Sequence, residues 1–460
     1  MQTGHFIAEH KGNQAVNESI TCFGSELKVN NARLSKMNLA IHGIEGQIAE
    51  SNSFYSDPHS LIGQCDFVMA NPPFNVKKVD KNKDYVKNDP RLFDDVGIPK
   101  ADNGNYLWIQ YFYHYLNEQG RAGFVMASSA TDAGNTEKAI RQKLIETGAV
   151  DCIVAVGNNF FYTRSLPCHV WFLDKGKCPE NKNRILMIDA RNTFRVVTNT
   201  INDYSPGQLR NFKAIMGAYR GDASAIADTN QQHQQSSVEM AQAITTESNQ
   251  LRETCQKILA AHCAVTLDFS AVLNALAEVM AVADDLDYQA CFDLIQRFEN
   301  PVEQLSAQME AYQNQLETDK KAWAALTKKD KTSAENKTKK KQLDAHNKLL
   351  RALMAAIGTH EEALKADLAN YKQQVNDWHT LLEHFPDNQY RDIEGLCKIV
   401  DREEVADNDY SLTPGRYVGY SIQIDEDFDY QGRMKKIQDQ LAKLNNEAIS
   451  LFSAIDEINL

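Results

Sequence analysis

The chain has 460 residues and a net charge of −13, a length that favours two or more domains and a charge that disfavours nucleic-acid binding by overall charge alone. Its hydrophobic fraction of 43% suits a soluble globular protein, and neither a membrane span of roughly 20 apolar residues nor a secretory signal is recognisable. Nine cysteines without any Cys-x-x-Cys pair predict reduced thiols in a cytoplasmic protein, and they predict no metal site.

Residues 1–200 alternate between short helices and short apolar strands, a pattern that predicts an α/β layer fold. The predicted helices cover residues 3–10, 32–42 and 106–116. The predicted strands cover residues 19–24, 66–70, 122–126, 152–156 and 168–173. The last two strands are close enough along the chain to pair as a hairpin.

Residues 222–395 differ in composition, because they are rich in Ala, Gln, Glu, Lys and Leu and poor in Gly, which predicts long helices. Two helical stretches flank a polar run at residues 327–341, so we expect a helical hairpin with a basic, mobile tip. The lysines of this run are Lys328, Lys329, Lys331, Lys337, Lys339, Lys340 and Lys341. A charge run is usually a solvated turn, and contact with DNA or RNA is the alternative interpretation.

The C-terminal segment contains a heptad pattern, in which apolar residues alternate three and four positions apart. Its members are Met434, Ile437, Leu441, Leu444, Ala448, Leu451 and Ile455. Such a seam requires a partner helix. Two partners remain open at this point, which are the helical hairpin of the same chain and another subunit.

The sharpest chemical signal is the tetrapeptide Asn71-Pro72-Pro73-Phe74, which follows the predicted strand 66–70 directly. Ligands of open α/β sheets bind beyond the carboxyl ends of the strands, so we expect this tetrapeptide at a binding site. The alternative is a rigid turn that only ends a strand, because Asn-Pro and Pro-Pro are common in turns.

These residue types suit methyl transfer to the exocyclic amine of adenine. The N6 lone pair is delocalised into the ring, so a useful site accepts hydrogen bonds from both N6 hydrogens and makes the nitrogen more nucleophilic. The Asn71 side-chain oxygen and the Pro72 carbonyl oxygen can accept these bonds, and successive prolines hold the acceptors rigidly. Phe74 offers a ring on which a base can lie after its nucleotide has flipped out of the duplex.

The segment 66–74, Asp-Phe-Val-Met-Ala-Asn-Pro-Pro-Phe, resembles the catalytic motif of N6-adenine DNA methyltransferases. Protein-glutamine methyltransferases share the Asn-Pro-Pro core, usually followed by Tyr. Further segments resemble the modification (M) subunits of type I restriction-modification systems, namely residues 23–26 with 33–43, residues 105–110 with 120–125, and residues 412–419. The helical segment between the matching parts is an insertion relative to compact members.

The resemblance implies a Rossmann-like methyltransferase sheet, S-adenosylmethionine as methyl donor, and assembly on DNA with a specificity (S) subunit, a second M subunit and a restriction (R) subunit. It implies that the catalytic residues are Asn71, Pro72, Pro73 and Phe74. The C-terminal heptad corresponds to the helix that packs against the S subunit in this family.

The resemblance also implies roles for three further residues. Glu26 matches the carboxylate that binds the cofactor ribose, and a solvated loop acid is its alternative role. Asn52 falls near the family's contact to the cofactor adenine. Phe161 matches the aromatic residue that holds the flipped base together with Phe74, and core packing is its alternative role.

The sequence departs from the family at its start. Family members carry a helical domain, a strand and an Asp-Pro-x-x-Gly-x-Gly-Gly loop just before the equivalent of residues 2–6. The loop brings backbone close to the cofactor and the strand is central, so its neighbours are expected to lack pairing partners. We therefore expect the chain alone to bind S-adenosylmethionine poorly, which micromolar binding in a calorimetric titration would contradict. A misassigned start, a frameshifted gene or a deliberate truncation would each account for the departure.

The predicted fold class is α/β, with a Rossmann-like sheet that lacks its first strand and Gly-rich loop, a long helical hairpin and a C-terminal helix. We expect a partial catalytic domain at residues 1–220, a coiled-coil-like helical insertion at 221–395, and a signature segment with a subunit-docking helix at 396–460. The predicted function is site-specific adenine-N6 methylation of DNA, impaired in this chain alone. The alternatives are a non-catalytic assembly subunit and, less favoured because of Phe74, a protein-glutamine methyltransferase.

Overall fold

The computed structural model of the chain describes residues 20–96, 98–99, 103–262 and 286–419, with Gly4 and scattered helical positions between 432 and 448. Residues 1–418 form one compact unit and residues 419–460 form a second. Apart from Gly4, the predicted helix over residues 3–10 lies outside the described residues.

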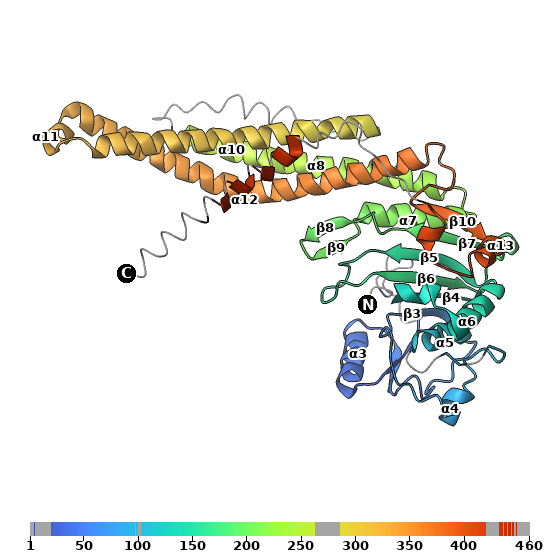
Figure 1. Cartoon of the computed structure of the whole chain (residues 1–460). Coiled ribbons are helices and arrows are strands. Elements are labelled where there is room, and N and C mark those ends of the chain that lie inside the picture. Colours follow the sequence, from blue (N-terminus) through green and yellow to red (C-terminus); the bar gives the residue numbers. More distant parts are fainter. Residues whose placement is uncertain are drawn as a thin grey trace. The chain divides into compact units, whose positions relative to one another are not determined.

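The strands of the first unit form three sheets (Figure 1). Two of these sheets have two strands each. In one, β1 (Cys22–Glu26) pairs in parallel with β2 (Gly46–Glu50), and in the other, β8 (Arg195–Thr198) pairs with β9 (Ile201–Asp203). The main sheet has the order β10-β7-β5-β6-β4-β3. Its strands are β3 (Cys65–Ala70), β4 (Leu116–Ala127), β5 (Val150–Val156), β6 (Cys168–Asp174), β7 (Arg184–Asp189) and β10 (Cys397–Asp401). The sheet is mixed, because β6 is antiparallel to both of its neighbours.

Several predicted elements are confirmed. A strand precedes the Asn-Pro-Pro-Phe corner, and β6 pairs with β5 as the predicted hairpin. The strand expected at residues 122–126 is longer, because β4 begins at Leu116, directly after helix α5. Its polar first half reads as a loop in the sequence, and pairing of Leu116 with Cys65 of β3 holds it in the sheet.

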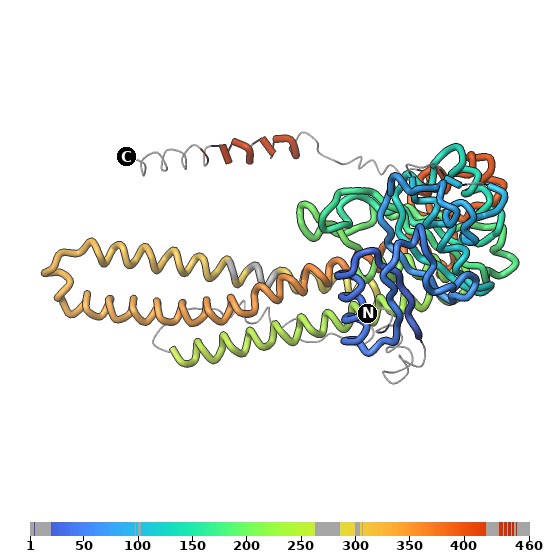
Figure 2. Tube along the Cα trace, turned by 90° about the horizontal axis from the view of Figure 1, so that it is seen from below, coloured from blue at the N-terminus to red at the C-terminus, as the bar shows by residue number. Residues whose placement is uncertain are grey.

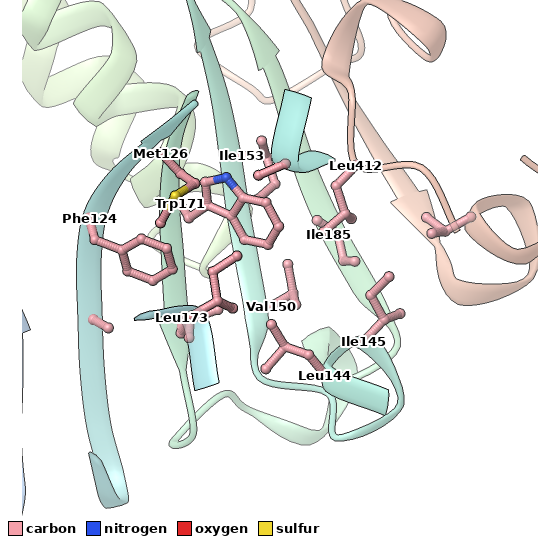
Figure 3. Packing of buried hydrophobic residues seen from close by; sticks show 14 of the residues in the cluster. Phe124, Met126, Leu144, Ile145, Val150, Ile153, Trp171, Leu173, Ile185 and Leu412 are labelled. Atoms are coloured by element: carbon pink, nitrogen blue, oxygen red, sulfur yellow. The ribbon is translucent and has the colours of Figure 1, made fainter. Parts of the chain in front are cut away.

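Helices cover both faces of the main sheet. One face packs against α5 (Asn105–Tyr115) and α6 (Asn135–Glu146), around Phe124, Ile153 and Trp171 (Figure 3). The other face packs against α7 (Pro206–Tyr219), whose start is fixed by a capping box between Ser205 and Gln208. This arrangement confirms the predicted α/β layer fold.

Short helices complete the first unit. They are α3 (Val29–Ile41), which connects β1 with β2, α4 (Asp84–Lys87), α13 (Arg402–Asp407), and the 3-10 helices η2 (Ser128–Asp132), η3 (Pro179–Asn181) and η4 (Pro414–Arg416). The strand β10 and the helix η4 belong to the C-terminal part predicted from residue 396 onward, and both pack on the main sheet.

β3 and β1 are among the strands that have an unpaired edge in the described part of the chain. β3 is one of the two outer strands of the main sheet, and β1 has β2 as its one described partner. Phe67 and Met69 of β3 are 73% and 75% exposed, although both are residue types that strands normally bury. The sheet that holds Glu26 and the sheet that precedes Asn71 are therefore not joined by any described strand.

The helical arm is formed by α8 (Ala225–Ala261), α10 (Tyr288–Ala324), α11 (Lys328–Lys331) and α12 (Ala334–His384). The long helices α8, α10 and α12 lie side by side, and α10 turns into α12 through α11 (Figure 2). Their shared core includes Leu251, Phe298, Leu349 and Leu353. The predicted long helices and hairpin are thus confirmed, and each helix places one apolar stripe in this core.

A buried polar network joins the base of the arm to α7. Asn211 donates to the Asp377 carbonyl at 2.9 Å, and Ser205 bonds the Asp377 carboxylate. His233 contacts the Asn211 side-chain oxygen at 2.8 Å and the Gln374 amide nitrogen at 2.9 Å. A neutral imidazole with its proton on Nε2 satisfies both contacts, since it donates to Asn211 and accepts from Gln374.

We expect the stability of the chain to fall as the pH drops from about 6.5 to 4, partly through His233. Burial, with a contribution from Arg210, lowers the pKa of His233 to about 4. In this pH window the unfolded chain binds a proton that the folded chain does not, so the unfolding free energy decreases by up to about 3 kcal/mol for this group. Urea denaturation across the window should show a smaller decrease for His233→Gln, and an identical decrease would contradict the assignment.

The described heptad residues of the second unit are exposed. Met434, Ile437, Leu441 and Leu444 are between 38% and 61% exposed, and Leu451 and Ile455 lie outside the described residues. Separately, none of the helices in the described ranges combines the length and apolar character needed to span a bilayer.

Candidate active site

The carboxyl ends of several strands meet at one edge of the main sheet. β3 and β4 are parallel, so Ala70 and Ala127 end at the same edge. Cys168, the first residue of β6, pairs there with both Ala127 and Val156. The loops that follow β3, β4 and β5 therefore leave the sheet together, which is where open α/β sheets bind ligands.

The Asn71-Pro72-Pro73-Phe74 corner leaves β3 at this edge. Asn71 is exposed, and its side chain makes no hydrogen bond to any described residue. Pro72 is buried, Pro73 is exposed and Phe74 is half-buried. The alternative interpretation, a turn whose Asn71 amide is consumed by local hydrogen bonds, finds no such bond among the described residues.

Asn105 holds the residue that follows the corner. Its side-chain oxygen accepts from the Asn75 backbone N–H at 2.8 Å, and its amide nitrogen donates to the Asn75 side-chain oxygen at 2.9 Å. Asn75 adopts a left-handed backbone with φ of 53°, a conformation that Asn tolerates better than most residues. Asn105 is fully buried at the first turn of α5, so the corner is anchored to a rigid helix.

Asn105→Ala should reduce the methyl transfer that the sequence leads us to expect by about 10- to 100-fold, because a misplacement of about 1 Å is enough for such a loss. The unfolding free energy should fall by only about 1–3 kcal/mol, the cost of an unsatisfied buried group. Asn105→Asp keeps the acceptor for Asn75 N–H and should recover part of the rate. Single-turnover rates and urea denaturation measured together would separate an effect on positioning from an effect on folding. Equal rates for the wild type, Asn105→Ala and Asn105→Asp would exclude the positioning role of Asn105.

Phe161 lies beside Phe74. It follows β5 in the loop between β5 and β6, and the two ring centroids are 6.2 Å apart in an edge-to-face arrangement. Both rings are half-buried and pack on the same hydrophobic cluster. The structure therefore brings together the two aromatic residues that were proposed from the sequence to hold the base, although they are 87 positions apart in the chain.

Glu26 and Asn52 lie at the ends of the parallel strands β1 and β2. Glu26 is the last residue of β1, and one of its carboxylate oxygens accepts from Lys28 N–H at 2.9 Å. Its second oxygen makes no hydrogen bond to any described residue. Asn52 follows β2 and caps the next turn, since its side-chain oxygen accepts from Phe54 N–H at 3.0 Å.

One hydrophobic cluster underlies the loops that carry Asn52 and the corner. Phe54 packs against Trp108 of α5 with ring centroids 4.4 Å apart, and both belong to the same cluster as Val76 and Tyr111. Arg91 is fully buried there and contacts the Tyr111 ring at 3.8 Å. The loop after β2 and the loop after β3 are therefore positioned by a common core.

The segment 412–419 packs on the same sheet edge. Leu412 N–H donates to the Thr131 carbonyl at 2.8 Å, and Arg416 pairs with Asp132 at 2.7 Å, both in the helix η2 that follows β4. Leu412 and Tyr417 enter the core of the main sheet. This segment thus braces the loop after β4 instead of contributing a separate reactive group.

Sequence reasoning missed the positioning roles of Asn105 and Arg91. In the sequence, Asn105 stood out only as part of the segment 105–110 that resembles type I M subunits, and no pattern pointed to Arg91. A polar residue at the start of an aromatic helix is a weak signal for Asn105. For Arg91, the spacing Asp89-x-Arg91 in a loop gives no sign that both side chains are buried.

The chain is similar to known DNA methylases. The model of the N-6 DNA Methylase family matches residues 1–254 and 339–426, well over half of the chain. The methylase subunit of the type I restriction enzyme MjaIX of Methanocaldococcus jannaschii is 38% identical over 190 residues, which is 41% of this chain and 34% of that protein. The methylase subunit of the HindI enzyme of Haemophilus influenzae is 29% identical over 222 residues, 48% of each protein. The chain thus spans between a third and half of these relatives.

Two solved structures are also similar. The type I methyltransferase subunit of Streptococcus thermophilus is 21% identical with a TM-score of 0.39, covering 44% of this chain and 48% of that one. The EcoKI M protein is 20% identical with a TM-score of 0.36, covering 46% of this chain and 44% of that one. From the match of the family model across both parts of the sequence, the chain belongs to the N-6 DNA methylase family.

Proposed function

We propose that this chain methylates adenine N6 in DNA, with S-adenosylmethionine as donor, as the modification subunit of a type I restriction-modification complex. The relatives reported above are methylase subunits of type I restriction enzymes. The single observation that supports the proposal most is the exposed, unbonded Asn71 at a sheet edge, next to the paired rings of Phe74 and Phe161.

The corner supplies acceptors for the amine. The Asn71 side-chain oxygen and the Pro72 carbonyl oxygen each accept from one N6 hydrogen, which draws the nitrogen lone pair out of the ring. Phe74 and Phe161 offer apolar faces to a base that has left the duplex, and stacking of one base contributes about 1–3 kcal/mol. The proton leaves N6 after the nitrogen has become cationic, so placement of the acceptors matters more than a strong base.

Glu26 and Asn52 are the proposed cofactor residues. The free carboxylate oxygen of Glu26 suits the ribose hydroxyl groups, because a carboxylate is a strong double acceptor. Asn52 comes two residues after the neighbouring parallel strand β2, which ends opposite Glu26, so both residues lie at the same edge of the β1–β2 sheet. The bound cofactor supplies an electrophilic methyl group, and these residues hold and orient its nucleoside.

The proposed partners are DNA, the S subunit, a second M subunit and the R subunit. The exposed heptad seam, from Met434 to Leu444 in the described residues, fits a docking helix for the S subunit. A two-stranded seam of this kind gains its stability by burying a and d residues against a second helix. Of the two partners left open by the sequence, we favour another subunit, because the family resemblance assigns the helix of this segment to packing against the S subunit.

The decisive experiment measures transfer of labelled methyl from S-adenosylmethionine to duplex DNA, at saturating cofactor and with the S subunit present. Label in adenine N6 supports the proposal. Label in a glutamine-containing peptide but not in DNA would assign the chain to protein-glutamine methyltransferases. Label in neither, with the complex assembled, would make the chain a non-catalytic assembly subunit.

A further inference from the structure

The tip segment (residues 327–341), where α10 turns into α12, carries a charge opposite to that of the chain. It contains seven lysines and two acidic residues, a net charge of +5, whereas the whole chain has −13. At least twelve of its residues, 327–338, lie outside the two parts matched by the N-6 DNA Methylase model. The methyltransferase fold of the family therefore does not account for this concentration of charge.

The backbone of the tip segment is held by specific hydrogen bonds. The Thr327 side chain accepts from Asp330 N–H at 3.2 Å and caps α11, and the Ser333 side chain accepts from Asn336 N–H at 3.1 Å and caps α12. The Asn336 amide also donates to the Asp330 carbonyl at 2.9 Å. Two capped helices in so short a turn present the lysines in a defined arrangement, which a merely solvated loop does not need.

Trp323, at the end of α10, organises two of the lysines. The ammonium groups of Lys331 and Lys340 lie 4.9 Å and 5.0 Å from its ring centroid, in cation–π contact. The indole N–H donates to the Asn336 carbonyl at 3.4 Å. The half-buried ring thus joins α10, α11 and α12 into one small platform.

Four lysines of this platform are available for a ligand. Lys328, Lys329, Lys337 and Lys341 are exposed, and none forms an ion pair with a described residue. The remaining lysines are engaged in part, because Lys339 pairs with Glu335 and Lys340 with Asp344. Lys337 and Lys341 stand one helical turn apart, roughly 6 Å along the axis.

We propose that the tip segment binds the phosphate backbone of duplex DNA, outside the site of methylation. Unpaired ammonium groups on long side chains are point charges suited to phosphates, and they carry no sequence preference. The segment contains no apolar side chain larger than Ala334, and protein interfaces need apolar or aromatic anchors and are depleted in lysine. A nucleic-acid backbone therefore fits this surface better than an acidic protein does.

The buried polar network around His233 joins one end of the helical arm to α7, and the tip segment lies at the opposite end of the arm. α10 alone has 37 residues, so its axis is roughly 55 Å long. A contact at the tip would lie many base pairs away from a base held at the Asn71 corner. It adds affinity and orientation without touching the flipped nucleotide, as backbone contacts do elsewhere.

The test compares the full chain with two charge-matched variants. The tip variant replaces Lys328, Lys329, Lys337 and Lys341 with Gln. The shaft variant replaces four exposed cations along the long helices, Lys257, Arg297, Arg351 and Lys365, with Gln. Affinity for a labelled duplex without any target sequence is measured by fluorescence anisotropy at several salt concentrations, and helical content is checked by circular dichroism.

We expect the tip variant to bind the duplex at least 10-fold more weakly near 0.1 M salt. The slope of the logarithm of the binding constant against the logarithm of the salt concentration should be smaller in magnitude by about 3–4, since each lost phosphate contact lowers it by about 0.9. The shaft variant should stay close to the wild type. Equal weakening in both variants, or none in the tip variant, would overturn the proposal. Unchanged DNA binding with lost capture of a partner subunit would assign the tip to an acidic protein surface instead. The anisotropy measurement needs neither S-adenosylmethionine nor a target sequence, so failure of methyl transfer cannot be confused with failure of tip binding.

Discussion

Asn71→Ala should lower the single-turnover rate of methyl transfer by about 10²- to 10³-fold, the loss seen when one preorganised hydrogen-bonding group is removed from a reacting centre. The side chain is exposed and makes no hydrogen bond to any described residue, so its loss should leave folding nearly unchanged. The rate is measured with labelled S-adenosylmethionine at saturation, on duplex DNA in the presence of the S subunit.

Asn71→Asp is the matched control for this prediction. It keeps an acceptor oxygen at nearly the same position and removes only the amide donor, so it should retain more activity than alanine. A wild-type rate for Asn71→Ala would exclude the proposed role of the corner. A rate loss accompanied by an equal loss of stability would make Asn71 a structural residue.

Arg91→Met should destabilise the chain by about 3–5 kcal/mol, the usual cost of removing one partner from a buried ion pair. The side chains of Arg91 and Asp89 are fully buried and pair at 2.7 Å. Arg91 also donates to the Ser53 carbonyl at 2.9 Å and to the Tyr115 hydroxyl at 2.8 Å. Methionine fills similar space but leaves the Asp89 carboxylate buried without a counter-charge.

Urea denaturation would measure this loss, and two further variants make it specific. The double variant Asp89→Asn with Arg91→Met removes both charges and should be less destabilised than Arg91→Met alone. Lys143→Met, which breaks the exposed pair with Asp95, should change stability little, because solvent screens that pair. Equal losses of unfolding free energy for Arg91→Met and Lys143→Met would contradict the prediction that the buried ion pair stabilises the chain more than the exposed one.

The Arg91 cluster also has a consequence for the site. Arg91 holds the loop after β2 through Ser53, and the same cluster includes Phe54 and Val76, the latter just beyond the Asn71–Phe74 corner. Asn52 and the corner belong to loops separated along the chain, yet they rest on one core. Loss of that core should therefore affect the proposed cofactor residue and the proposed acceptor residues together.

The parts of the fold that follow from local sequence were predicted well. The strand before Asn71 is a short apolar run closed by prolines, and both signals lie within a few residues of each other. The long helices of the arm follow from composition and apolar spacing over dozens of residues. The hairpin of β5 and β6 follows from their proximity along the chain.

The parts that depend on distant pairing were not predicted. β4 was expected to be less than half as long, because its first residues are polar and the pairing of Leu116 with Cys65 of β3 leaves no trace in the local sequence. β10 joins β7 although about 200 residues, including the helical arm, separate them. No local pattern in either strand encodes that partner, since strand pairing is decided by which backbone edges remain free.

By itself, the amino-acid sequence determined which chemical groups are present: an amide, two prolines and a ring at the end of a short apolar strand, with a second ring proposed from the family resemblance. Only the tertiary structure decided that Phe161 contacts Phe74, that Asn105 bonds Asn75, and that Asn71 is exposed without a hydrogen bond to any described residue. The reason is physical. Residue types and local propensity specify what a side chain can do, whereas its neighbours and exposure arise from contacts between segments that the chain brings together only on folding.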